Sequence, residues 1–189
     1  MVEDPDLHII TVGTKPSQRY DMVLAALECG KHVYTCLPFA TSAQQAKAMR
    51  DKQWEKGVVG VADAQFRWVP ATRHLKELID AGKLGDFYQA TLHMQLPLLA
   101  YDGFVYPYCV QSETQKPYTW LGEANSGGSA CNFGSHALLN LMYLFGEIEE
   151  VIGTMDTFCK EWKLTDGRTV RPQTPDIAAA LVRFRKGGI

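Results

Sequence analysis

The sequence lacks an excess of either charge. Its 189 residues include 19 Lys and Arg against 21 Asp and Glu, which gives a formal net charge of −2 at pH 7. Such a chain has no basic surplus to neutralise a phosphate backbone or an anionic membrane surface, so we expect neither nucleic acid nor membrane among its partners. The longest uncharged stretch, 124–146, contains Asn, Ser, Gly and His side chains, which is not typical of a membrane span.

The sequence also lacks the cysteine and histidine patterns of a zinc or redox site. It has five cysteines, no two of them in C-x-x-C spacing, and five histidines without the spacing of metal ligands. Reduced thiols are the simplest interpretation. The acidic start, with Glu3, Asp4 and Asp6, is unlike the positively charged start of a secretory signal. We therefore expect a cytoplasmic protein without a metal centre.

A glycine-rich dinucleotide fingerprint is absent as well, because no two glycines are separated by a single residue. What is present is the composition of a folded globular chain: 46% hydrophobic, 11% aromatic and 21% charged residues. This balance excludes disordered, collagen-like and coiled-coil proteins.

Strand patterns alternate with helix patterns over the first third of the chain. Short apolar runs typical of buried strands occupy residues 7–13, 31–35 and 58–62. Ser17 is expected to cap the helix after the first run, and Thr41 or Ser42 the helix after the second, which Gly57 ends. This order predicts βαβ units and a parallel sheet, although three strands are too few for a complete doubly wound domain.

The pattern changes after Gln65, and we place a domain boundary there, between residues 1–64 and 65–189. Helices are expected from Pro70 to about Gly82 and after the glycine-rich segment 126–129. Strands are expected at 87–95, 148–157 and 176–184, with a hairpin turn at 185–188. Residues 96–120 are rich in aromatic residues without a clear period, which indicates a long functional loop.

The ends of the first two predicted strands are candidate binding elements. Ligands of open α/β sheets bind beyond the carboxyl ends of the strands. At residues 13–17, backbone N–H groups at a helix start are placed to face a phosphate or ribose, and an ordinary βα turn is the alternative. Residues 36–39 form an apolar corner, for which a tight turn stiffened by proline is the alternative.

His136 is the best candidate for acid–base chemistry. At helical spacing, His136, Asn140 and Tyr143 share one face, opposite an apolar stripe, and Asn132 lies one turn earlier. An imidazole off the core face suits proton transfer, whereas a histidine that only orders a loop is the alternative. Arg67, Trp68 and Trp120 are weaker candidates for lining a cleft, with simple packing as the alternative.

Taken in order, six segments resemble the Gfo/Idh/MocA family (glucose–fructose oxidoreductase and inositol dehydrogenase). They are 24–33 (LAALECGKHV), 36–40 (CLPFA), 65–70 (QFRWVP), 75–85 (LKELIDAGKLG), 127–136 (GGSACNFGSH) and 174–176 (TPD). The resemblance implies an α/β fold: a partial Rossmann-type parallel sheet followed by an incomplete α/β domain with a mostly antiparallel open sheet. It also implies an internal piece of a protein nearly twice as long, and a homo-oligomer.

The same resemblance implies an NAD- or NADP-dependent oxidoreductase that transfers hydride to or from a sugar, polyol or related alcohol or carbonyl compound. It implies His136 as general acid or base and Asn132 as the group orienting the substrate oxygen. The remaining implied site residues are Thr14, Lys15, Pro16, Cys36, Leu37 and Pro38 for the cofactor, and Arg67 and Trp120 for the substrate.

Two of these positions depart from the family pattern. Leu37 stands where the family has a lysine, and Asn132 where it has an aspartate, so His136 is the one titratable group of the three that remains. The departures keep a second hypothesis open: a non-catalytic regulatory binding protein of the same fold that senses a nucleotide or sugar.

Overall fold

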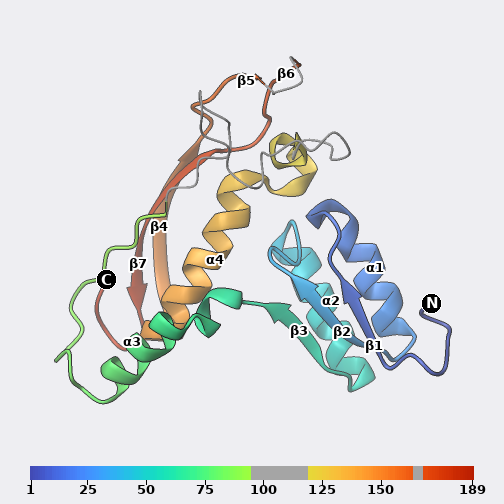
Figure 1. Cartoon of the computed structure of the whole chain (residues 1–189), viewed down its shortest axis with the longest axis horizontal. Coiled ribbons are helices and arrows are strands. Elements are labelled where there is room, and N and C mark those ends of the chain that lie inside the picture. Colours follow the sequence, from blue (N-terminus) through green and yellow to red (C-terminus); the bar gives the residue numbers. More distant parts are fainter. Residues whose placement is uncertain (95–118, 164–167) are drawn as a thin grey trace.

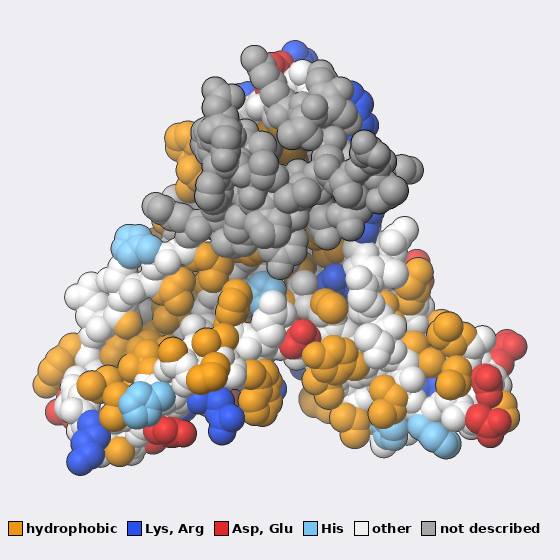
Figure 2. Space-filling model, viewed as in Figure 1, with side chains coloured by type: hydrophobic (Ala, Val, Ile, Leu, Met, Phe, Trp, Pro, Cys, Tyr) orange, Lys and Arg blue, Asp and Glu red, His pale blue; other side chains and the backbone are white. Residues whose placement is uncertain are grey.

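The computed structural model describes residues 1–94, 119–163 and 168–189. Its described part forms two lobes (Figure 1), one around a parallel sheet and the other around a long helix on an antiparallel strand pair. In the space-filling view (Figure 2) the lobes are separated by a notch, and hydrophobic side chains gather on the visible face of both. Nearly all of the loop predicted at 96–120 lies outside the described residues.

The first lobe contains the parallel sheet that the sequence predicts. Its strands β1 (Ile9–Val12), β2 (His32–Cys36) and β3 (Gly60–Asp63) pair in the order β1-β2-β3. Helices α1 (Pro16–Glu28) and α2 (Ala43–Lys56) connect them. The core is formed by alternate residues of β1 and β2 together with side chains from both helices: Ile10, Val12, Val33, Val23, Ala26, Leu27 and Met49.

The ends of these two helices are set by different means. Ser42 caps α2 as predicted, because its Oγ accepts a hydrogen bond from the N–H of Gln45 at 3.2 Å, and Gly57 ends the helix with φ of 64°. The prediction for Ser17 is wrong. Pro16 is already in the first turn of α1, Lys15 holds the cap position, and no side chain caps the helix. Proline favours this place because its fixed φ is helical and it has no N–H to satisfy.

The second lobe is entered through the short helix η1 (Gln65–Trp68) and helix α3 (Pro70–Asp80), which agrees with the start predicted at Pro70. The long helix α4 (Gly128–Phe145) lies along strands β4 (Ile148–Asp156) and β7 (Ile177–Phe184), which pair antiparallel (Figure 1). Short elements complete the lobe: η2 (Thr119–Gly122), η3 (Ala124–Ser126), β5 (Trp162–Lys163) and β6 (Thr169–Val170).

The prediction of a strand at 87–95 is wrong for residues 87–94, the part that the structure describes. These residues form no strand. Among the described contacts, their backbone is hydrogen-bonded only to Ile189. The N–H of Ala90 donates to the carbonyl of Ile189 at 2.9 Å, and the N–H of Ile189 donates to the carbonyl of Tyr88 at 3.0 Å. Phe87 nevertheless fixes the segment, because its ring stacks on Phe145 at 4.1 Å and meets Phe184 at 5.7 Å between centroids. Apolar packing therefore holds a segment that lacks a full ladder.

Four of the five cysteines fall in the described part of the chain, and all four are free thiols. Within the same ranges, no helix is both long enough and apolar enough to cross a membrane.

Candidate active site

The carboxyl ends of the three parallel strands meet at one edge of the first sheet. Residues 13–15 follow β1, the corner Cys36–Pro38 follows β2, and Asp63 ends β3 directly opposite Cys36 in the strand register. This is the edge at which open α/β sheets bind ligands. The structure thus brings the two binding segments predicted from the sequence to one place.

Arg19 joins these two segments. Its Nε donates to the carbonyl of Thr14 at 2.6 Å, and its Nη1 donates to the carbonyls of Cys36, at 3.0 Å, and Pro38. The residue is only 5% exposed, and burial lowers the pKa of Arg19, with an opposing contribution from Cys36. The sequence analysis missed this residue, because nothing in the spacing of a lone arginine on α1 reveals three carbonyl acceptors in two loops.

The other proposed cofactor residues surround this arginine. Pro16, Leu37 and Pro38 are buried, whereas Thr14 and Cys36 are partly exposed and Lys15 is exposed. Pro16 has no N–H and the N–H of Gln18 donates to the carbonyl of Lys15 at 3.0 Å, so Ser17 provides the first-turn N–H that is open to an anionic or hydroxyl-bearing ligand.

His136 lies beside the end of β3. The α4 helix begins at Gly128, so Asn132 and His136 share one face one turn apart, as the sequence analysis expected for an early helix start. The imidazole packs edge-on against Phe66 of η1, with 5.1 Å between ring centroids. The ring is half-buried rather than sealed in the interior.

Asp63 is a charged group near His136 that the sequence analysis did not find. Burial lowers the pKa of His136, and the negative charge of Asp63 opposes that shift. Partial desolvation and a hydrogen bond to Asp63 raise the pKa of Tyr34, so the same carboxylate affects a second titratable group. Asp63 and His136 are 73 positions apart, and only the packing of η1 against α4 brings them within electrostatic reach.

Three buried polar atoms around this helix have no hydrogen-bond partner in the described part of the chain: Arg67 Nε, His136 Nδ1 and Asn140 Oδ1. The guanidinium of Arg67 stacks over Trp68, 5.3 Å from the ring centroid. Buried polar groups in folded proteins are nearly always bonded to protein, water or ligand. These three atoms therefore mark a part of η1 and α4 where the described residues do not supply a polar partner. Trp120 of η2 is half-buried, and η2 packs against α4.

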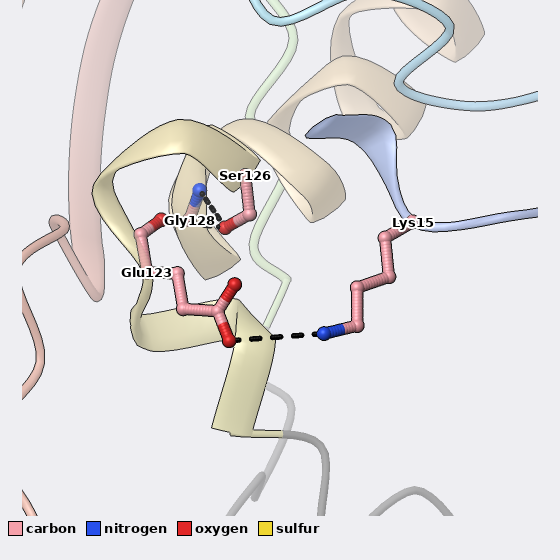
Figure 3. Close-up of polar contacts among 4 residues, drawn as sticks. All are labelled: Lys15, Glu123, Ser126 and Gly128. Atoms are coloured by element: carbon pink, nitrogen blue, oxygen red, sulfur yellow. Dashed lines mark hydrogen bonds and ion pairs between the residues drawn. The ribbon is translucent and has the colours of Figure 1, made fainter. Parts of the chain in front are cut away.

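The start of α4 is fixed by polar contacts and joined to the other lobe (Figure 3). Ser126 Oγ donates to the carbonyl of Glu123 at 2.8 Å and accepts from the N–H of Gly128 at 3.2 Å. The Glu123 carboxylate forms an ion pair with Lys15 Nζ at 3.7 Å, which connects the start of α4 to the turn after β1. Among the described residues, no cluster of three or more His, Cys, Asp or Glu side chains is placed to bind a metal ion.

Comparison with known proteins identifies the family that has this arrangement. Residues 72–189 match the sequence model of the GFO/IDH/MocA C-terminal domain, and residues 1–63 match that of the oxidoreductase family with an NAD-binding Rossmann fold. Among curated relatives, levoglucosan dehydrogenase from Pseudarthrobacter phenanthrenivorans is 26% identical over the whole chain and 49% of its own length. The NAD(+)-dependent scyllo-inositol 2-dehydrogenase of Bacillus subtilis is 33% identical over 45% of the chain and 25% of its own length.

A solved structure of levoglucosan dehydrogenase in complex with NADH has the same fold, with a TM-score of 0.79 and 24% sequence identity. The match covers 99% of this chain and 47% of the levoglucosan dehydrogenase chain. The chain spans about half the length of the levoglucosan dehydrogenase that it matches. The family models cover both lobes, and the fold agrees with the partial Rossmann-type sheet and antiparallel pair expected from the sequence. The chain belongs to the Gfo/Idh/MocA family of NAD-binding oxidoreductases.

Proposed function

We propose that the protein is an NAD(P)-dependent oxidoreductase that transfers hydride to or from a carbinol or carbonyl carbon of a sugar, polyol or related compound. The observation that carries this proposal is the placement of a half-buried imidazole, His136, beside the ligand-binding edge of a Rossmann-type sheet. Relatives named for levoglucosan and scyllo-inositol, both polyhydroxylated compounds, support the substrate class.

Thr14, Lys15, Pro16 and the Cys36–Pro38 corner would hold the ribose and nicotinamide, with the N–H of Ser17 at the start of α1 contributing a donor. When bound, the nicotinamide supplies the hydride acceptor for alcohol oxidation or the hydride donor for carbonyl reduction. Leu37 offers this site an apolar wall but neither a proton nor a hydrogen bond.

His136 moves the proton that accompanies the hydride. Because burial lowers the pKa of His136, the ring is mainly neutral at pH 7 and accepts the proton of a substrate hydroxyl during oxidation. In the reverse direction the protonated ring returns that proton to the carbonyl oxygen. Asn132 orients the substrate oxygen from the same helix face, and Arg67 and Trp120 line the substrate pocket.

Steady-state assays with a panel of polyols and sugars, each with NAD and NADP, test this function. We expect His136→Ala to lower kcat by about 10²- to 10⁴-fold, since that is the usual contribution of a general acid or base. The same change at His74, an exposed residue of α3, is the control and should leave kcat unchanged. Normal turnover by His136→Ala would contradict the role of the imidazole. Cofactor binding without turnover on any substrate would instead favour the regulatory binding protein.

We also propose that the protein is a cytoplasmic homo-oligomer. Apolar side chains on one face of the β4–β7 pair support this: Ile152, Leu181 and Ile177 are 72%, 55% and 50% exposed. Exposed apolar patches of this kind commonly mark protein interfaces. Light scattering after size-exclusion chromatography should give a mass above that of one chain, and Ile152→Lys with Leu181→Lys should lower it.

A further inference from the structure

We propose that Arg19 is a positioning residue, whose guanidinium holds the Cys36–Pro38 corner against the turn after β1 in the geometry that binds the nicotinamide cofactor. This inference rests on the proposed function and adds to it a residue that the sequence patterns did not indicate.

Three hydrogen bonds from one side chain join the two loops. Nε reaches the carbonyl of Thr14, at 2.6 Å, and Nη1 reaches the carbonyls of Cys36 and Pro38. The two nitrogens belong to one rigid planar group, so the two loops are held at a fixed separation. Two of the three acceptors flank Leu37, and the orientation of the whole corner is therefore tied to Arg19.

The arginine is buried without a carboxylate counter-charge among the described residues. Arg19 is 5% exposed, and among the described residues no carboxylate lies within ion-pair distance of it. The buried face of α1 otherwise continues with Val23, Ala26 and Leu27, where an apolar side chain would serve the core equally well. A buried cation is costly unless it is fully hydrogen-bonded. Its presence at this position is explained by the carbonyls that it binds.

The pairing of the strands does not depend on Arg19. The β1–β2 register is already fixed by four parallel residue pairs, from Ile9↔His32 to Val12↔Thr35. Thr35 Oγ1 adds a buried hydrogen bond to the carbonyl of Val12 at 2.9 Å. All three carbonyls bound by Arg19 lie after these pairs, at the ligand-binding edge. Loss of the guanidinium would therefore release the loops while the strands stay paired.

The substitutions Arg19→Lys and Arg19→Met test this inference in the full protein. Lysine keeps the charge but donates from a single atom, so it cannot span both loops as the guanidinium does. We expect either variant to raise the cofactor Kd and KM by about tenfold or more, with the substrate KM less affected, because misplaced binding groups lose affinity and rate together. Arg50→Lys, on exposed α2, is the matched control and should change neither constant.

Hydrogen–deuterium exchange of the protein alone gives a second readout that does not depend on turnover. In Arg19→Lys we expect faster exchange at residues 13–15 and at the amides of Leu37 and Phe39, with unchanged protection of β1 and β2. Wild-type cofactor affinity and wild-type loop exchange in Arg19→Lys would overturn the positioning role and leave the proposed function intact. Should Arg19→Met not fold, Arg19→Lys carries the test. A wild-type protein that binds no NAD or NADP would overturn the proposed function, and the exchange data would still report whether Arg19 holds the loops.

Discussion

Replacing Gly128 with alanine should displace the start of the helix that carries His136. Gly128 has φ of +75°, and a Cβ built on it would lie 2.5 Å from Thr174 Cβ and 2.7 Å from Thr174 Oγ1. Thr174 is 4% exposed and donates from Oγ1 to the carbonyl of Leu121 at 2.8 Å, so it has no free direction in which to turn. Left-handed backbone costs a non-glycine residue about 1 to 2 kcal/mol, and overpacking adds about 1 to 3 kcal/mol.

We therefore expect Gly128→Ala to lower the free energy of unfolding by about 3 kcal/mol, measured by urea denaturation. Gly134→Ala is the matched control on the same helix, because no heavy atom lies within 4 Å of its Cβ and its φ is not positive. The control should be neutral or more stable by about 0.5 to 1 kcal/mol, since alanine is the better helix former. Equal stability of the two variants would refute the reasoning, as would an unchanged Thr174 contact in a crystal structure of Gly128→Ala.

Two further predictions concern charge. Burial lowers the pKa of His136 in the folded protein below its value in the unfolded chain. The free energy of unfolding contributed by the neutral ring is therefore fully present above the pKa of the unfolded state, and it is lost as the pH falls through the pKa of the folded state. Asp63→Asn removes the charge that opposes this lowering, and the titration of His136 followed by NMR should move to lower pH; a move to higher pH would contradict the assignment. The ion pair between Lys15 and Glu123 is about half exposed, so Glu123→Gln should cost at most about 0.5 kcal/mol in low salt, and the cost should vanish in high salt. A salt-independent loss would mean that Glu123 acts through packing.

Local sequence signals predicted most of the first lobe and the main helices of the second. Ser42 and Gly57 bound α2 because their effects, a side-chain cap and a left-handed φ, act within a few residues. Ser17 failed as a cap because Pro16 begins the helix before it. The strand predicted at 87–95 failed because alternating apolar residues indicate an extended segment but not the partner with which it pairs.

The contacts of the candidate site were less accessible from the sequence. His136 was found because helical spacing places it off the apolar stripe, and the strand ends 13–17 and 36–39 followed from the topology of parallel sheets. The electrostatic influence of Asp63 on His136 depends on tertiary packing, including that of η1 against α4, which no local spacing encodes. Arg19 was missed for a related reason: its acceptors are backbone carbonyls, which every residue possesses, so their identity depends entirely on where the loops lie.

The imidazole and the loops held by Arg19 belong to different lobes, connected in sequence through η1 and α3 and in space by the Lys15–Glu123 ion pair. A rotation of one lobe relative to the other therefore changes the distance between His136 and the loops proposed to hold the cofactor, although neither is itself altered. Substitutions at the joint between the lobes, remote from every reacting atom, should for that reason slow catalysis without weakening the binding of either molecule alone.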